Sequence, residues 1–140
     1  MGWDACATIN GEYFGIGERL LPSDAHLRDI FKVANDKLTK IVGVGDDYLV
    51  SGELGGWRSK LVLERATQER CFDVNNKSGV IDWSAEMVKR LNTAADWSFP
   101  KHSASEDAYA PYHYDEHTFW CVKIFLDTCA ANNLGIKFTW

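Results

Sequence analysis

The hydrophobic pattern is most informative near the C-terminus, in residues 115–140. Apolar side chains there cover nearly every side of a helix: Phe119, Trp120, Val122, Ile124, Phe125, Leu126, Cys129 and Ala130. A helix that is apolar all round is usually buried among other elements. We therefore expect residues 119–130 to form a central helix around which the rest of the fold packs.

A short strand is expected after this helix. Residues 132–135 read Asn-Asn-Leu-Gly, and both Asn and Gly accept the left-handed conformation that closes a helix. Ile136, Phe138 and Trp140 then alternate with polar residues. This period of two is typical of a strand with one buried face.

The N-terminus predicts a hairpin. Apolar or small residues recur at every second position from Trp3 to Ile9, which is the spacing of a strand. Asn10-Gly11 follows, and this dipeptide is the strongest short signal for a two-residue hairpin turn, because both positions must accept positive φ. Residues 12–17 would form the return strand.

An amphipathic helix is expected after the hairpin. Ser23 or Asp24 can cap its start. Apolar residues then recur at helical spacing until Gly43 and Gly45 end the pattern. These residues are Leu27, Ile30, Phe31, Ala34, Leu38 and Ile41.

The middle of the chain allows more than one interpretation. Residues 48–50 are compatible with a short strand or a single helical turn. Residues 57–68 contain an apolar triplet that suits a strand, but they also contain good helix formers after a double glycine, and we favour a helix. Ser84 is expected to cap a further helix over residues 85–95. A long connection with two prolines follows in residues 96–114.

Together these elements define the expected fold. A length of 140 residues suits a single domain, residues 1–140. We expect an α+β fold in which three to four helices pack on a small, mainly antiparallel sheet. The N-terminal hairpin should pair with the C-terminal strand.

Charge and hydropathy narrow the function classes. Fifteen Lys and Arg stand against twenty Asp and Glu, which gives a net charge of −5. Nucleic-acid binders gain most of their affinity from Lys and Arg against phosphate, so we expect no nucleic-acid partner. No apolar run approaches the ~20 residues of a membrane span, and we expect no signal peptide before Trp3, because residues 1–4 contain neither a basic start nor an apolar stretch. We therefore expect no membrane association.

The four cysteines favour a reducing compartment. None belongs to a C-x-x-C pair, which argues against a zinc ribbon or a thioredoxin-type motif. Cys121 and Cys129 lie about 12 Å apart along the expected buried helix, too far to bridge. Cys121 is also one helical turn from His117, but a reactive thiol needs exposure, so we interpret it as packing. A cytoplasmic location follows.

One short cluster contains metal-ligand side chains. His113, Asp115 and His117 combine imidazole and carboxylate groups, which suit zinc, manganese or iron. Their spacing matches none of the familiar metal motifs. Asp115 and Glu116 are fully explained as first-turn acids that stabilise a helix start, and we favour this structural interpretation over a metal site. The sequence contains no complete phosphate- or dinucleotide-binding loop, and we expect no cofactor.

The connection before the last helix is rich in aromatic rings. Six Trp, seven Phe and five Tyr are many for this length, and Tyr and Trp are favoured anchors at interfaces. Here they are mixed with acids, which suits a basic protein partner or a small cationic ligand held by ring faces. The alternative is that the rings attach the loop to the body. The candidate binding residues are Trp97, Phe99, Tyr109, Tyr112, Tyr114, Glu106 and Asp107.

Three blocks of sequence stand out together: MGWDA at residues 1–5, DWSAEMV at residues 82–88 and LGIKFTW at residues 134–140. In these blocks the chain resembles a group of small bacterial proteins to which no activity is assigned. The resemblance implies a bacterial or phage origin and carriage on mobile elements. It transfers no site residue.

Three functional hypotheses follow. The first is a non-enzymatic cytoplasmic binding protein with a protein partner, of which an immunity or antitoxin-like role is one version; a homodimer is also compatible with the surplus of rings. The second is a small-molecule binding domain that uses the aromatic segment of residues 97–114. The third is a metal-dependent hydrolase centred on His113 and His117.

Overall fold

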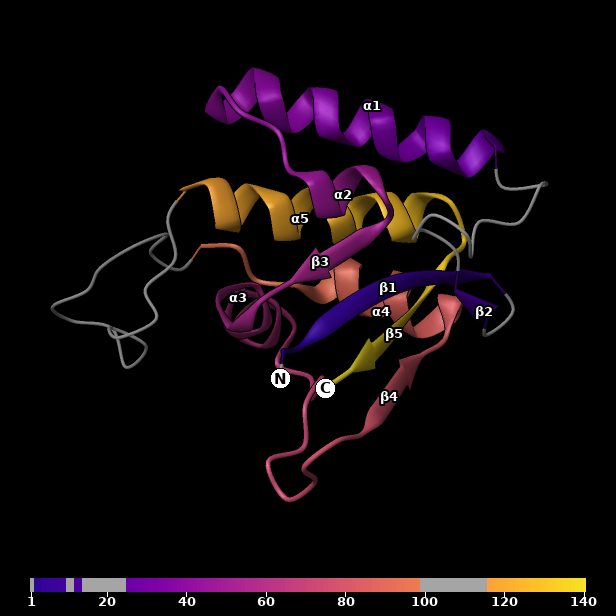
Figure 1. Ribbon diagram of the computed structural model, residues 1–140, viewed down its shortest axis with the longest axis vertical. Helices are drawn as coiled ribbons and strands as arrows, with labels where there is room; N and C mark the ends of the chain where they lie inside the picture. Colours follow the sequence, from indigo (N-terminus) through magenta and orange to yellow (C-terminus); the bar gives the residue numbers. More distant parts are fainter. Residues whose placement is uncertain (1, 10–11, 14–24, 99–115) are drawn as a thin grey trace, which may run out of the picture.

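A computed structural model describes residues 2–9, 12–13, 25–98 and 116–140 of the chain. The expected Asn10-Gly11 turn, the capping residues Ser23 and Asp24, and residues 99–115 of the aromatic connection lie outside the described residues. The described part confirms the α+β fold, in which helices pack on an antiparallel sheet that joins the N-terminal and C-terminal strands (Figure 1).

The sheet in the described part of the chain has five strands. They are β1 (Asp4–Ile9), β2 (Glu12–Tyr13), β3 (Glu53–Gly55), β4 (Val80–Trp83) and β5 (Gly135–Thr139). The strand order is β2-β1-β5-β4, and β3 also pairs with β1; every pair is antiparallel. The two chain ends lie side by side in Figure 1, because Asp4 pairs with Thr139.

One face of the sheet forms the aromatic part of the core. Phe138 lies opposite Ala5 on β1 and opposite Ile81 on β4. Its ring stacks on Trp3 at 5.6 Å and meets Trp83 edge-on at 4.6 Å between ring centroids. The small side chain of Ala5 leaves room for these rings, so the face packs tightly.

β1 is covered on both faces. Cys6 and Thr8, which alternate with the inward residues Ala5 and Ala7, are only 7% and 3% exposed. The Cys6 thiol donates a hydrogen bond of 3.2 Å to the Glu53 carboxylate. Since Glu53 is the register partner of Cys6 on β3, the added strand explains part of a burial that the alternating pattern did not predict.

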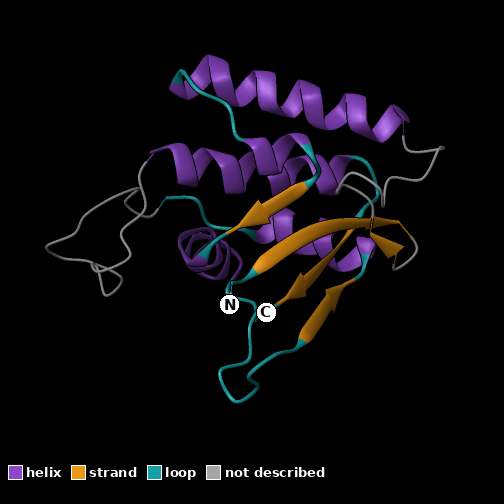
Figure 2. Ribbon diagram, viewed as in Figure 1, coloured by secondary structure: helices purple, strands orange, loops and turns teal. Residues whose placement is uncertain are grey.

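The described helices are α1 (Ala25–Val42), α2 (Asp47–Val50), α3 (Trp57–Thr67), α4 (Ala85–Ala94) and α5 (Glu116–Ala131). Helix α5 contacts α1, α3, α4, β3 and β5, and Figure 2 shows it between the outermost helix α1 and the strands. Its residues from Phe119 to Cys129 are buried on nearly every side. The expected central helix is confirmed.

The expected stop after α5 is confirmed as well. Asn133 adopts a φ of 58°, and the Leu134 N–H donates to the Cys129 carbonyl at 3.0 Å. The strand that follows buries Ile136 and Phe138 completely, while Lys137 between them stays partly exposed.

The amphipathic stripe of α1 is confirmed at its centre and wrong at its end. Phe31, Ala34 and Leu38 are buried, whereas Ile41 is 41% exposed. Val42 packs against the core instead. The neighbouring position at the end of the helix faces the core better, which the spacing alone did not distinguish.

The middle of the chain resolves the open alternatives. Residues 57–67 are helical, as favoured, and residues 47–50 form the single turn α2. Ser84 caps α4, with its Oγ accepting a 3.2 Å hydrogen bond from the Met87 N–H. Strands β3 and β4 have three and four residues, which is too short for a recognisable period, and neither was predicted.

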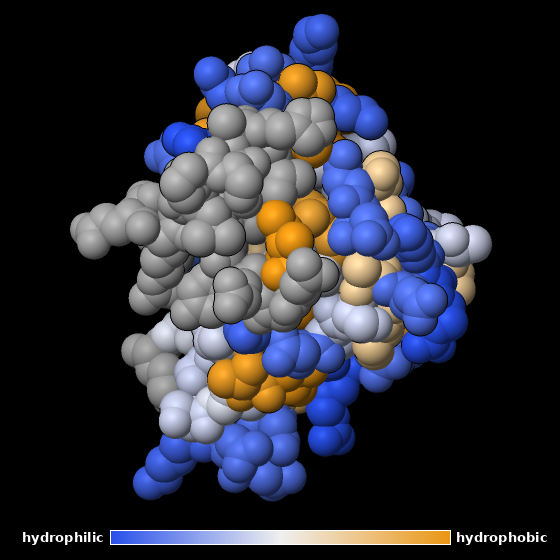
Figure 3. Space-filling view, turned by 90° about the vertical axis from the view of Figure 1, so that its right-hand side faces the viewer, coloured by the Kyte–Doolittle hydropathy of each residue, from blue (hydrophilic) through white to orange (hydrophobic). Residues whose placement is uncertain are grey.

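None of the described helices combines the length and apolar character needed to cross a membrane. The described part of the face in Figure 3 is largely hydrophilic, and its hydrophobic residues gather in separate groups rather than in one continuous surface.

Candidate functional site

The residues predicted to bind a partner or a metal are described only in part. Phe99, Glu106, Asp107, Tyr109, Tyr112, His113, Tyr114 and Asp115 lie outside the described residues. Trp97 and His117 are described, and the two belong to different environments.

Trp97 packs against the first half of α5. Its ring meets Phe119 edge-on with 5.8 Å between centroids, and the Lys123 ammonium lies 5.7 Å from its centroid. These contacts attach the segment after α4 to the central helix. For this ring the geometry matches the structural alternative, in which aromatic residues hold the connection to the body.

His117 lies in the first turn of α5. Its Nε2 donates to the Gly45 carbonyl at 3.0 Å, so the ring carries a proton on Nε2. This bond attaches α5 to the loop between α1 and α2. Within the described residues, no group of three or more His, Cys, Asp or Glu side chains is arranged to hold a metal ion, and a role for His113 and Asp115 stays a prediction.

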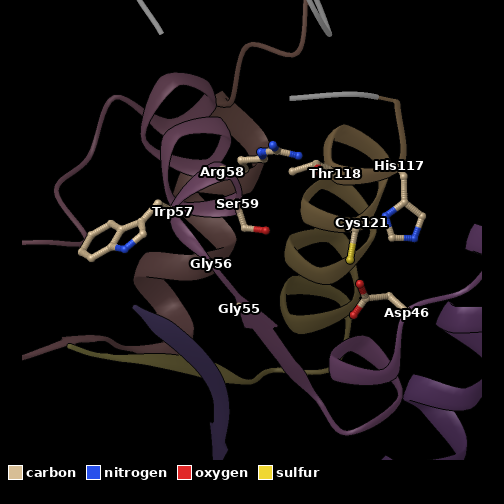
Figure 4. A pocket seen from close by; sticks show the side chains of 9 residues that line it. All are labelled: Asp46, Gly55, Gly56, Trp57, Arg58, Ser59, His117, Thr118 and Cys121. Atoms are coloured by element: carbon tan, nitrogen blue, oxygen red, sulfur yellow. The ribbon is translucent and has the colours of Figure 1, made fainter. Parts of the chain in front are cut away.

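His117 also lines a pocket of about 390 Å³ between the starts of α3 and α5 (Figure 4). This volume is within the range of small-molecule sites. Its walls come from the loop before α2, the β3–α3 junction and the first turns of α5. The lining residues are Asp46, Gly55, Gly56, Trp57, Arg58, Ser59, His117, Thr118 and Cys121.

The β3–α3 junction presents backbone donors. Gly56 has a φ of +90°, which side-chain-bearing residues rarely adopt, so the sharp turn from strand to helix requires glycine there. The first hydrogen bond of α3 runs from the Lys60 N–H to the Gly56 carbonyl at 3.2 Å. The N–H groups of residues 57–59 therefore precede the helical ladder, and Gly56 provides no side-chain cap.

Ser59 is a pocket residue whose side chain has no protein hydrogen-bond partner among the described residues. It is only 8% exposed, and its hydroxyl points into the pocket in Figure 4. The hydroxyl opens into the pocket and is not among the buried unsatisfied polar atoms of the described residues, so it is available to hydrogen-bond a molecule that enters the pocket.

The start of α3 is electrically positive. The aligned peptide dipoles place partial positive charge at a helix N-terminus, and α3 has no acid in its first turn to balance it. Arg58 adds a full positive charge at the same end. It is exposed and makes no ion pair within the described residues, and Figure 4 shows its guanidinium reaching toward Thr118 on α5.

Asp46 forms the opposite wall. Its N–H donates to Asn35 Oδ1 at 2.7 Å. Its own Oδ1 accepts from the N–H groups of Tyr48 and Leu49 at 2.9 and 3.1 Å, which makes it the cap of α2. These bonds fix both the backbone and the side chain of Asp46. Its carboxylate faces the pocket beside the Cys121 sulfur (Figure 4).

Cys121 contributes a neutral thiol to the wall. Burial raises the pKa of Cys121 far above its ordinary value, and the nearby Asp46 carboxylate raises it further. The thiolate is the nucleophilic form of cysteine. The Cys121 thiol is therefore held in its protonated form at neutral pH, which is the less nucleophilic one.

Other pockets in the described part of the chain offer less specific chemistry. A groove of about 480 Å³ between α1 and α5 is lined by Val33 and Ala131 among others. One of about 550 Å³ at the β4–α4 junction contains Ser84, whose hydroxyl already caps α4. One of about 250 Å³ is lined by Lys60, which forms an ion pair with Glu64 at 2.8 Å.

Sequence reasoning missed the α3–α5 pocket. The double glycine at residues 55–56 was interpreted only as an element boundary. Residues 55–59 read Gly-Gly-Trp-Arg-Ser, which places a glycine turn before a helix start with a cation and a hydroxyl but no acid. Phosphate-binding loops use the same combination of glycines and a helix N-terminus. Asp46 and His117 carry no comparable local signal.

Comparisons with known protein families, with curated proteins and with solved structures find no match to this chain.

Proposed function

We propose that this protein binds a small anionic molecule whose phosphate or carboxylate group lies at the start of α3. The observation that carries the proposal is Ser59, a largely buried residue whose hydroxyl points into the pocket and has no protein partner among the described residues. The proposal keeps the expected class of small-molecule binding domain. It moves the site from the aromatic segment of residues 97–114 to the α3–α5 pocket, and it replaces the expected cationic ligand with an anionic one.

Three further features support an anion. The N–H groups of residues 57–59 come before the first hydrogen bond within α3. Such N–H groups at a helix N-terminus have no partner within the helix and can donate to an anion. Arg58 supplies a charge that geometrically suits carboxylate and phosphate oxygens. No first-turn acid competes for these donors.

Inorganic phosphate is a direct probe of this site. We expect phosphate to raise the melting temperature, because a ligand that binds only the native state stabilises it by mass action. The amide resonances of residues 57–59 should shift most in a nitrogen-15 spectrum. Arg58→Gln and Ser59→Ala should each weaken phosphate binding roughly tenfold, the usual effect of losing a hydrogen bond to a charged group.

Two controls separate a site from general charge effects. Arg70→Gln removes an exposed arginine beyond the other end of α3 and should leave phosphate binding unchanged. Sodium chloride at equal ionic strength should not reproduce the shifts. A phosphate response that persists in Arg58→Gln and Ser59→Ala, or that maps away from residues 57–59, would refute the proposal.

A second candidate is the binding of a basic protein, the first of the expected functions. The chain carries a net charge of −5. Ile41, Val44 and Tyr48 are 41%, 58% and 54% exposed where α1 leads into α2, next to the exposed acid Asp47. A solvent-facing apolar and acidic surface suits a basic partner. This function agrees with the cytoplasmic location that four free cysteines favour.

An immunity or antitoxin-like role, with the bacterial origin that the sequence resemblance implies, is the specific version of this second function. Its test is the affinity for an identified basic partner. Val44→Asp and Tyr48→Asp should abolish that binding, whereas Val74→Asp, at an 80% exposed position elsewhere, should retain it. Equal loss in all three variants would exclude this surface.

A further inference from the structure

The wall opposite Arg58 carries a negative charge. Asp46 Oδ1 is occupied by the two backbone N–H groups of α2. Its Oδ2 makes no hydrogen bond or ion pair within the described residues, and the carboxylate faces the pocket in Figure 4. A carboxylate retains several acceptor sites after two bonds to one oxygen, so Asp46 remains free to accept from a ligand.

This carboxylate is a fixed part of the pocket. Asn35 on α1 holds its backbone N–H, and the start of α2 holds its Oδ1. The side chain therefore cannot turn away without uncapping α2. His117, anchored to the adjacent Gly45 carbonyl, keeps α5 beside this wall. The negative charge is thus positioned by contacts that are independent of α3.

A simple anion would be opposed by this charge. Within a partly buried pocket, two like charges repel more strongly than in bulk water. An anion bound at α3 is attracted by Arg58 but repelled by Asp46. A ligand that also carries a positive group on the Asp46 side would be attracted by both walls.

We propose that the ligand is a small zwitterion, with its anionic group at the start of α3 and its ammonium group on Asp46. This inference rests on the proposed anion site and specifies its ligand class. A pocket of about 390 Å³ has room for both groups. The opposite charges of the two walls, supplied by Arg58 and Asp46 across one cavity, would also discriminate against simple anions and simple amines.

Two matched pairs of probes test this assignment by titration calorimetry on the full chain. Phosphoethanolamine is compared with ethyl phosphate, and γ-aminobutyrate with butyrate. In each pair only the first compound carries an ammonium group. We expect the zwitterion of at least one pair to bind roughly tenfold or more tightly than its partner, since a hydrogen bond between charged groups typically contributes that much. The preferred pair identifies the anionic group.

Asp46→Asn should remove this preference while leaving the binding of the simple anion equal or stronger. Asn caps helices about as well as Asp, so α2 and the fold should be retained. Asp47→Asn makes the same charge change at an exposed neighbour outside the pocket lining and should preserve the preference.

The outcomes separate the two proposals. Equal affinity within both pairs, or a preference that survives Asp46→Asn, overturns the zwitterion proposal. In either case, binding of a simple anion that depends on Arg58 still supports the anion site. Absence of any binding that depends on Arg58 and Ser59 overturns the anion site itself.

Discussion

Burial determines the chemistry of single residues in this protein, as the cysteines show. Desolvation raises the pKa of the Cys71, Cys121 and Cys129 thiols far above their ordinary values, with further increases from Glu64 at Cys71 and from Asp46 at Cys121. The sequence predicted buried, unbridged cysteines in α5, and this is confirmed. The adjacent acids at Cys71 and Cys121 come from tertiary contacts and could not be inferred from spacing.

Because of these raised pKa values, we expect the free energy of unfolding to decrease at alkaline pH. An unfolded thiol ionises near pH 8.5, whereas the folded thiols retain their protons well above that value. The native state therefore binds more protons, so stability is full below about pH 8.5 and falls as pH rises. The slope is about 1.4 kcal/mol per pH unit for each buried thiol.

Urea unfolding between pH 7 and pH 10 measures this slope. Cys129→Ala removes a fully buried thiol. It should reduce the slope of stability against pH by about 1.4 kcal/mol per pH unit, the contribution of one thiol. An unchanged slope would show that this thiol ionises equally in the folded and unfolded states.

At the scale of elements, local signals were sufficient where an element contains its own pattern. The central stripe of α1 and the cap of α4 could be predicted from a few neighbouring residues, whereas the exposure of Ile41 at the end of α1 could not. By contrast, β3 and β4 are defined by pairing with β1 and β5. Partners distant in sequence supply the hydrogen bonds of such short strands, so their own residues carry little information.

Ser84 gives a test at this scale. Ser84→Ala removes the acceptor for the Met87 N–H and should destabilise the protein by about 1 kcal/mol. Ser84→Asp keeps an oxygen that can accept this hydrogen bond, and its negative charge interacts favourably with the positive end of the helix dipole. This variant should therefore retain the wild-type stability. Thermal and urea unfolding would measure both; equal losses in the two variants would contradict a capping role.

At the scale of the whole molecule, α5 holds the layers together. It contacts three other helices and two strands, and its side chains fill the space between α1 and the sheet. Phe125 is completely buried and meets Phe31 of α1 at 6.1 Å between ring centroids. The loss of such a ring would leave a cavity shared by several elements.

Phe125→Ala should therefore destabilise the fold by about 3–5 kcal/mol. This is a large part of the ~5–15 kcal/mol that stabilises a typical domain. Val33→Ala shortens a side chain that is 66% exposed on α1, and its effect should stay within about 0.5 kcal/mol. Similar midpoints of urea unfolding for the two variants would contradict the central position of α5.

The sequence by itself determined the fold class, the buried central helix, its stop and the strand that follows. These features depend on periodicity and on turn residues, which act over a few neighbouring positions. Only the tertiary structure decided the candidate site. Its walls come from Asp46, residues 55–59 and the start of α5, which are far apart in the chain and meet because the central helix packs against α3 and the α1–α2 loop. Charge and hydrogen-bonding groups act through space, so the pocket they form became visible only after packing had placed them together.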